Sequence, residues 1–334
     1  MKKFMVVILV LVLTIPVFAK GQTESDEQQL TKELSFPTGP ITLVCPWAAG
    51  AGADLICRMF ESLGMEYFGV PIVVENQVGA AGMTATLNFL NAKNDGYSVL
   101  FNNGGVFTSK LLTGAAGYSI QDFQPLCGIV KDINILICNS KNLGVSNFEE
   151  FLEKFSGTEK TLLMGAGTAG IPHICMAQLF DKANIKFKQI AYSGGSEISA
   201  ALLGGHVDIV ALGASEINIV KDAKNIALLT AFADETPEAL GLENVPPLAN
   251  YGYDIDTSVW RMLLVPKGTP EHIFNKLYEG FTGMIQDVRF KDFAKKNGIT
   301  IDMKSPEEVT KAVEDELSEM IPIFKALKLG IYSN

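Results

Sequence analysis

Short apolar segments alternate along the chain with stretches of helical spacing, and turns of Gly, Ala or Ser separate them. This order, which begins after Phe36, is typical of parallel βαβ units. Most of the apolar segments are apolar on both faces, which favours α/β sheets covered by helices on two sides. They predict strands at Ile41–Cys45, Pro71–Glu75, Ser98–Phe101, Ile133–Cys138, Thr161–Met164, Lys186–Ala191, Val207–Leu212, Ile226–Phe232 and Arg261–Val265.

Two start signals predict helices near the carboxyl end of the chain. Thr269 and Pro270 begin one helix, and Ser305-Pro306-Glu307-Glu308 supplies an N-cap, a first-position proline and a capping-box glutamate for another. Apolar residues then recur at helical spacing, which indicates a packing face and not a cofactor site. These residues are Val309, Val313, Leu317, Ile321 and Phe324.

The N-terminal residues have the pattern of a secretory signal peptide. Met1-Lys2-Lys3 precedes an apolar run from Phe4 to Phe18, and the small residue Ala19 ends a cleavage pattern. A membrane-spanning helix is the alternative, but it needs about 20 apolar residues, and Pro16 interrupts this shorter run. We therefore expect removal of residues 1–19, a polar leader over residues 20–36, and a mature protein that is periplasmic and soluble.

Composition fits a two-domain protein that does not bind nucleic acid. The 334 residues suit two domains of roughly 150 residues each, and the hydrophobic share of 48% excludes global disorder. A net charge of −10 argues against nucleic acid and anionic membranes as partners. Any anionic ligand would therefore have to be held by local groups.

The five cysteines show no CxxC spacing and lie in apolar contexts, so we expect buried thiols. A Cys45–Cys57 or a Cys127–Cys138 disulfide stays open, because the sequence does not give their separation.

Candidate binding groups lie in the loops that follow the predicted strands, where open α/β sheets bind ligands. The loops combine small residues with predicted helix starts, so they expose backbone N–H groups that favour an anion. They would hold a carboxylate without lysine or arginine. The alternative is that small residues only permit tight turns. The loops are Pro46–Arg58, Glu75–Gly82, Asn102–Gly105, Gly165–His173 and Tyr192–Ser196.

Catalytic patterns are weak or missing. The three histidines lack metal-ligand spacing, and Ile198 replaces the closing glycine of a GxSxG motif. Gly165–Gly170 fits GxGxxG, but the next predicted strand ends in Tyr192-Ser193 and not in the acid that a dinucleotide site requires. We therefore expect no enzyme, no cofactor and no metal, and keep an exported dinucleotide enzyme as the alternative.

Several motifs in the same order resemble those of the periplasmic receptors of tripartite tricarboxylate transporters, often called Bug-type receptors. The resemblance spans nearly the whole mature chain and is therefore more specific than the lone GxGxxG. Its motifs are PITLVCPWAAGAGADLICR (Pro40–Arg58), VVENQVGAAG (Val73–Gly82), NDGYSVLF (Asn94–Phe101), GAGTAGIPHICMAQLF (Gly165–Phe180), IAYSGGSEISAALLGGHVDIVALG (Ile190–Gly213), VWRMLLVPKGTP (Val259–Pro270) and SPEEV from Ser305.

The resemblance implies an α/β, two-domain periplasmic-binding-protein fold of the type II, Venus-flytrap class, each domain a mostly parallel sheet flanked by helices. Residues 37–129 and 236–334 would form the first domain and residues 130–235 the second. It also implies a receptor, which we expect to be a monomer, that captures a small carboxylate between the domains and delivers it to a membrane permease. A ligand sensor for a membrane signalling protein would use the same fold and stays open.

The resemblance also implies which residues bind the ligand. For Asp54 two roles stay open, contact with the ligand or stabilisation of the helix start in which it lies. We expect Trp47 to line the site, and we expect His173 to be a helix-start residue and not a ligand contact. The chain departs from the family at Ala51 and Ala81 (usually Gly), Val78 (often Pro) and Ser193 (commonly Lys). The implied ligand-binding residues are Trp47, Ala48, Ala49, Gly50, Ala51, Gly52, Ala53, Asp54, Asn103, Gly167, Thr168, Ala169, His173, Tyr192, Ser193, Gly194, Gly195 and Gly213.

Overall fold

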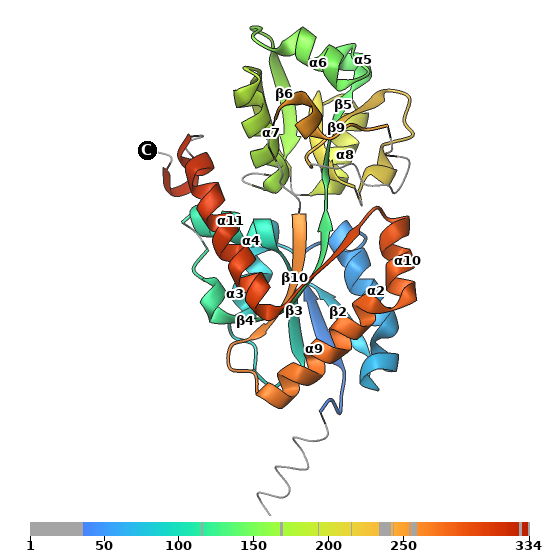
Figure 1. Ribbon diagram of the computed structural model, residues 1–334, viewed down its shortest axis with the longest axis vertical. Helices are drawn as coiled ribbons and strands as arrows, with labels where there is room; N and C mark the ends of the chain where they lie inside the picture. Colours follow the sequence, from blue (N-terminus) through green and yellow to red (C-terminus); the bar gives the residue numbers. More distant parts are fainter. Residues whose placement is uncertain are drawn as a thin grey trace, which may run out of the picture. The chain divides into compact units, whose positions relative to one another are not determined.

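A computed structural model places most of the chain in two mixed sheets covered by helices (Figure 1). Contacts divide the chain into Met1–Phe36 and Pro37–Asn334, and the fold below belongs to the second unit. The predicted signal peptide and nearly all of the leader lie outside the described residues. The structure describes residues 36–114, 116–167, 170–192, 194–214, 216–233, 242, 244–253, 255, 259–326 and 329–332.

The first sheet has six strands in the order β11-β4-β10-β3-β1-β2. β1 pairs in parallel with β2 and β3, whereas β10 runs antiparallel to β3 and β4, and β11 antiparallel to β4. The strands are β1 (Ile41–Cys45), β2 (Ile72–Asn76), β3 (Ser98–Asn103), β4 (Phe123–Asp132), β10 (Val259–Pro266) and β11 (Thr300–Lys304).

The second sheet has five strands in the order β7-β6-β8-β5-β9. β6 pairs in parallel with β7 and β8, and β5 runs antiparallel to β8 and β9. The strands are β5 (Asn134–Asn139), β6 (Thr161–Ala166), β7 (Lys186–Ala191), β8 (Ile209–Gly213) and β9 (Ile226–Ala231).

The helices cover the faces of both sheets (Figure 1). The α-helices are α2 (Gly52–Phe68), α3 (Met83–Phe89), α4 (Gly104–Leu112), α5 (Ser140–Leu143), α6 (Phe148–Phe155), α7 (Ile171–Lys182), α8 (Gly195–Leu203), α9 (Glu271–Gln286), α10 (Val288–Lys296) and α11 (Pro306–Ala326). Short 3₁₀ turns are η1 (Ala80–Gly82), η2 (Ile120–Asp122), η3 (Ile217–Ile219), η4 (Leu248–Tyr251) and η5 (Gly330–Tyr332).

The predicted two-domain α/β class is confirmed, but the sheets are mixed and not mostly parallel. The reason lies in the connections between the sheets. The chain leaves the first sheet through β4, enters the second directly as β5, and returns as β10. The chain enters the second sheet as β5 and re-enters the first as β10, so each of these strands begins at the end of the sheet where its neighbours end, and it runs antiparallel to them. The domain boundaries near residues 130 and 235 stay a prediction.

Helix α11 contacts two hydrophobic cores. Val309 and Val313 are buried in the core that contains Trp260 on the first sheet, whereas Met320 and Phe324 belong to a core built mainly from the second sheet. The predicted capping box is present: Glu308 accepts from the Ser305 N–H at 2.7 Å, and Ser305 Oγ accepts from the Glu308 N–H at 3.2 Å. The predicted packing face of this helix is therefore confirmed.

All five cysteines are free and buried, as expected. The Cys45 and Cys57 side chains hydrogen-bond to each other, so they are neighbours without being bridged. Burial raises the pKa of Cys127 and of Cys138 to about 12, which keeps both thiols protonated.

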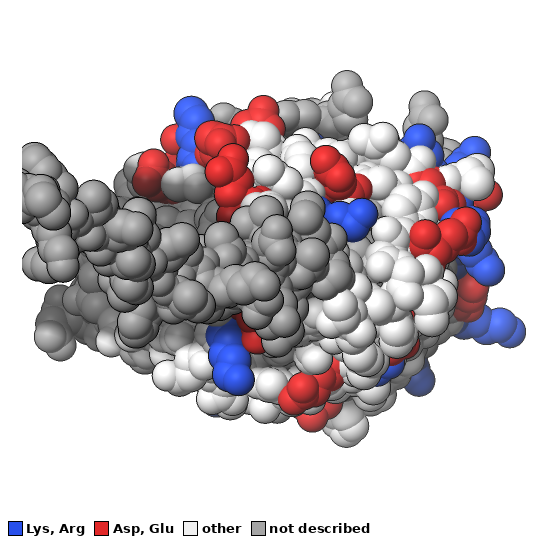
Figure 2. Space-filling model, turned by 90° about the horizontal axis from the view of Figure 1, so that it is seen from below, with Lys and Arg blue, Asp and Glu red and all other residues white. Residues whose placement is uncertain are grey.

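Two properties of the described surface bear on partners. No helix of the described residues is long and apolar enough to cross a membrane. On the face shown in Figure 2, acidic and basic side chains of these residues are interspersed.

Candidate functional site

Strand directions bring two sets of loops to one junction. β1 and β3 run the same way, so the loop after Cys45 and residue Asn103 lie at one edge of the first sheet. β4 ends at this edge in Asp132, because it runs antiparallel to β10 and β10 antiparallel to β3. Only Ile133 separates β4 from β5, so this edge adjoins the edge where β5 begins. That second edge carries the loops after β6, β7 and β8, since β8 runs antiparallel to β5.

Asp54 shapes the first of these loops, Pro46–Ala53. Its side chain is 5% exposed, and Oδ2 accepts from the Gly50 N–H at 2.8 Å. Oδ1 accepts from Asn76 Nδ2 at 2.8 Å and from Arg58 Nε at 3.3 Å. Asn76 Nδ2 also donates to the Trp47 carbonyl at 2.9 Å. Asp54 therefore fixes the loop to the end of β2, and its contact with a ligand stays a prediction.

The remaining residues of this loop differ in exposure. Ala48, Ala49 and Gly50 are exposed, Ala51 and Ala53 are half-buried, and Gly52 is buried where α2 begins. Gly50 has φ +83°, a left-handed conformation that disfavours other residues. Trp47 is half-buried, and its ring lies edge-on to Phe101 with 6.2 Å between centroids.

The loop after β2 lies against Trp47 and contains left-handed alanines. Ala80 and Ala81 have φ of 47° and 52°, between Gly79 and Gly82, whose φ is also positive. An added Cβ at Gly82 would lie 3.6 Å from the Trp47 ring, so this turn packs beside the first loop. Such strained backbone is common at functional sites.

The loops of the second sheet are partly described. The Gly170 N–H, directly before α7, donates to the Gly167 carbonyl at 3.1 Å, and the Tyr192 N–H donates to the Ala166 carbonyl at 3.2 Å. Gly194 is extended at φ −178° and precedes α8. The predicted site residues Thr168, Ala169 and Ser193 lie outside the described residues.

His173 is buried in the first turn of α7. Desolvation lowers its pKa to about 4, so the imidazole is neutral at neutral pH. A neutral ring does not add positive charge to the site.

A carboxylate from the chain itself lies at the start of α8. A Cβ added to Gly195 would lie 2.6 Å from Glu216 Oε2, so only glycine permits this approach. Desolvation of the carboxyl group raises the pKa of Glu216 to about 7, and the charge of Asp132 raises it further. The charge of Arg261 and a hydrogen bond from the Gly213 backbone lower the pKa and partly offset this rise. The backbone site predicted at Gly194-Gly195 is therefore next to an acid that sequence reasoning missed.

Arg261 and Asp132 form a buried ion pair at the same junction. Arg261 Nη2 lies 3.1 Å from Asp132 Oδ2, and the two side chains are 7% and 1% exposed. Gly213, at the end of β8, lies close to this pair, since an added Cβ would lie 2.6 Å from Asp132 Oδ2. Sequence reasoning expected no cation here. The available signal was a lone arginine inside the apolar strand segment Val259–Val265.

A second carboxyl group lies where α4, α11 and β10 meet. Glu316 Oε2 accepts from Trp260 Nε1 at 3.2 Å, and enclosure raises the pKa of Glu316 to about 7. An added Cβ at Gly105 would lie 2.9 Å from Glu316 Oε1 and 2.4 Å from Ile171 of α7. This group therefore lies beside the contact between α4 and the second sheet's helix α7.

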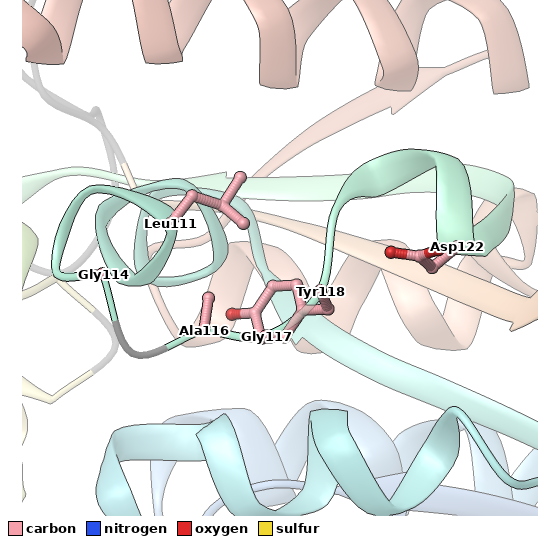
Figure 3. A pocket seen from close by; sticks show the side chains of 6 residues that line it. All are labelled: Leu111, Gly114, Ala116, Gly117, Tyr118 and Asp122. Atoms are coloured by element: carbon pink, nitrogen blue, oxygen red, sulfur yellow. The ribbon is translucent and has the colours of Figure 1, made fainter.

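A pocket of about 390 Å³ lies elsewhere, after α4 (Figure 3). It contains none of the predicted site residues, and the carboxylate of Asp122 in its lining is hydrogen-bonded to the Ser119 N–H at 2.7 Å. Its lining consists of Leu111, Gly114, Ala116, Gly117, Tyr118 and Asp122. Within the described ranges, no group of three or more His, Cys, Asp or Glu side chains could hold a metal ion.

A family model described as "Tripartite tricarboxylate transporter family receptor" matches residues 56–329. The chain belongs to this receptor family. The family comprises solute-binding receptors and not enzymes, so the dinucleotide-enzyme alternative is set aside.

Relatives of the tripartite tricarboxylate transporter receptor agree with this assignment. A UPF0065 protein from the TAR-I ttuE-ttuC′ intergenic region of Agrobacterium vitis is 26% identical over 296 residues, 86% of this chain and 84% of that protein. A Rhodopseudomonas palustris structure solved with adipate has a TM-score of 0.82 at 21% identity, covering 88% of this chain and 99% of the other. MatC of the same organism, solved with bound malate, has a TM-score of 0.77 at 21% identity, covering 86% and 99%.

Proposed function

We propose that this receptor binds a small carboxylate between the loops of its two sheets and delivers it to the permease subunits of a tripartite transporter in the membrane. The observation that carries the proposal is the junction itself. There, loops of small residues at the starts of α2, α7 and α8 are brought together by the single linking residue Ile133. Helix starts offer unpaired N–H groups that suit an anion.

Family membership and two structural neighbours support the ligand class. Those neighbours were solved with malate and with adipate, which are both carboxylates. We carry over the chemical class and not either ligand. Closure of the two domains around the ligand would follow from contacts to both loop sets, because a ligand shifts an equilibrium only through differential contacts.

The cellular context is part of the same proposal. We infer that residues 1–19 direct export and are cleaved after Ala19, that the mature protein acts in the periplasm, and that it is a monomer. Mass spectrometry of the exported protein tests the cleavage: a mature chain that starts at Lys20 is the expected result.

Thermal-shift screening of mono-, di- and tricarboxylates tests the function. A bound ligand at 100 times its Kd stabilises the folded state by about 2.7 kcal/mol, so at least one carboxylate should raise the Tm by several degrees. No shift with any carboxylate would contradict the proposal.

A matched pair of glycine variants then tests the position of the site. Gly194 has open space around an added Cβ and extended backbone, so Gly194→Val should fold normally and lower the affinity at least tenfold. Gly39→Val is the control, since Gly39 also has open space and lies before β1, outside these loops. Calorimetry with the best carboxylate should give wild-type affinity for the control. Equal affinities of all three proteins would place the ligand elsewhere.

A further inference from the structure

Arg261 has hydrogen-bonding capacity that the described residues do not use. Its side chain is 7% exposed, and among the described residues only Nη2 has a hydrogen-bond partner, Asp132, while the charge of Arg261 also acts on Glu216. Nε and Nη1 are buried and have no hydrogen-bond partner among the described residues. Unpaired N–H groups on a buried cation are costly, so a group that accepts from them would be bound favourably.

Asn103 lies directly beside this arginine, and it has an acceptor without a donor where Arg261 has donors without an acceptor. The two residues are partners in the β3–β10 register, so their side chains share a face of the sheet, with Cβ atoms typically about 5 Å apart. Asn103 Oδ1 is buried and has no donor within the described part of the chain. The pair therefore offers two N–H donors and one oxygen acceptor at neighbouring positions.

Both residues lie at the edge that carries the proposed carboxylate site. Asn103 ends β3, and Arg261 lies near the start of the antiparallel strand β10. Gly213 of the second sheet approaches Asp132, the partner of Arg261. Donors from the first sheet are therefore next to the loops of the second.

We propose that Arg261 binds a carboxylate of the ligand through Nε and Nη1, and that Asn103 Oδ1 accepts a hydrogen bond from a donor group on the same ligand. This inference rests on the proposed function and makes it more specific. The ligand class is a carboxylate with a hydroxyl or an ammonium group on the neighbouring carbon. Asp132 has a positioning role, because it holds the guanidinium in place.

Three matched sets of probes test the ligand class. Each set has a plain, a hydroxy and an amino acid of equal chain length: propionate, lactate and alanine; succinate, malate and aspartate; glutarate, 2-hydroxyglutarate and glutamate. In the set that binds best, the hydroxy or the amino member should bind at least tenfold more tightly than the plain member. The better of the two identifies the donor. Equal or tighter binding of the plain acid, or no binding in any set, overturns the inference.

Two variants test the residues. Arg261→Lys keeps the charge beside Asp132 but loses the guanidinium N–H groups, so we expect affinity to fall at least tenfold. Arg289→Lys is the matched control, because Arg289 also pairs with acids, Glu66 and Asp287, at an exposed site outside the junction. Asn103→Ala should reduce the preference for the substituted acid to less than twofold and leave binding of the plain acid unchanged.

The outcomes separate this inference from the function itself. If carboxylates bind, Arg261→Lys stays within twofold of wild type and Asn103→Ala keeps the preference, the receptor function stands and the role of this pair is refuted. If Arg261→Lys does not fold, the Asn103→Ala preference decides alone. If the Arg289→Lys control loses affinity as much as Arg261→Lys, the effect is not specific to the junction and the inference fails.

Discussion

The starts of α2 and α8 both have a carboxylate from the chain nearby, yet the two differ in how it is held. Asp54 belongs to α2 itself and accepts from three donors, on Gly50, Asn76 and Arg58. Glu216 lies outside α8, approaches Gly195, and has its pKa raised by enclosure and by Asp132. The first loop is thus fixed by a side chain whose oxygens accept three hydrogen bonds, whereas the second is next to an acid whose pKa is raised.

Removal of the Asp54 side chain should cause the largest loss of stability among the changes that test this comparison. Asp54→Ala leaves the Gly50 N–H without its acceptor and removes one of the two acceptors of Asn76 Nδ2, and we expect a loss of about 2–4 kcal/mol in the free energy of unfolding. Urea unfolding measures it. Asp95→Ala is the control, since among the described residues Asp95 accepts one hydrogen bond, from the Tyr97 N–H at an exposed turn. A cost under about 1 kcal/mol for Asp54→Ala would show that the first loop is not held in this way.

The pH dependence of stability tests the acids with raised pKa values, Glu216 beside α8 and Glu316 beside α4. Enclosure raises the pKa of Glu216 and of Glu316 from 4.5 to about 7, so between these values the folded state binds more protons than the unfolded state. The free energy of unfolding should therefore fall as pH rises from about 4.5 to 7. Deprotonation of each of the two groups should contribute a loss on the order of 1–2 kcal/mol.

Glutamine variants identify the groups responsible. Glu216→Gln and Glu316→Gln should each be more stable than wild type at pH 8 and equal to it at pH 4, as measured by urea unfolding. Glu197→Gln, in the first turn of α8, is a control for a general effect of removing charge near that helix. A wild-type pH profile that both variants leave unchanged would contradict the role of these acids.

The smallest expected effect concerns the strained turn beside Trp47. Ala81→Gly removes the steric cost of φ +52°, and the gain in stability should be about 0.5–1 kcal/mol despite the greater freedom of glycine when unfolded. Ala85→Gly, at a buried position inside α3, is the control and should destabilise by about 1–2 kcal/mol, from helix propensity and from the lost methyl group. Destabilisation by both changes would show that the turn is not strained.

Strand positions could largely be predicted from the sequence, and two strands could not. β4 contains Gln124, Pro125 and Gly128, which interrupt its apolar pattern, and β11 carries the charged residues Asp302 and Lys304. The prediction of mostly parallel sheets was wrong, because a run of apolar residues does not show in which direction the strand crosses the sheet. Helix starts at Pro306 and Glu271 were predicted well, since their signals are local.

In the candidate site, too, local features could be predicted from the sequence, and contacts between distant residues could not. The loops of small residues follow strands directly, so the sequence locates them. The Arg261–Asp132 pair joins residues 129 positions apart, and only the register of β10 against β4 brings them together. Glu216 likewise gains its role from Gly195 and Asp132, neither of which is close to it in sequence.

The one-residue link between the sheets limits how they can turn against each other. The Ile133 carbonyl accepts from the Ala214 N–H at 2.8 Å, so this residue is held by the second sheet, and a pivot must lie on the β4 side of it. Helix α11 packs on both cores and contains Pro322, which lacks an N–H for the helical hydrogen bond. At these two connections between the sheets, a swing would use the φ and ψ dihedrals of Asp132 and the turn of α11 around Pro322, because a peptide bond itself does not rotate.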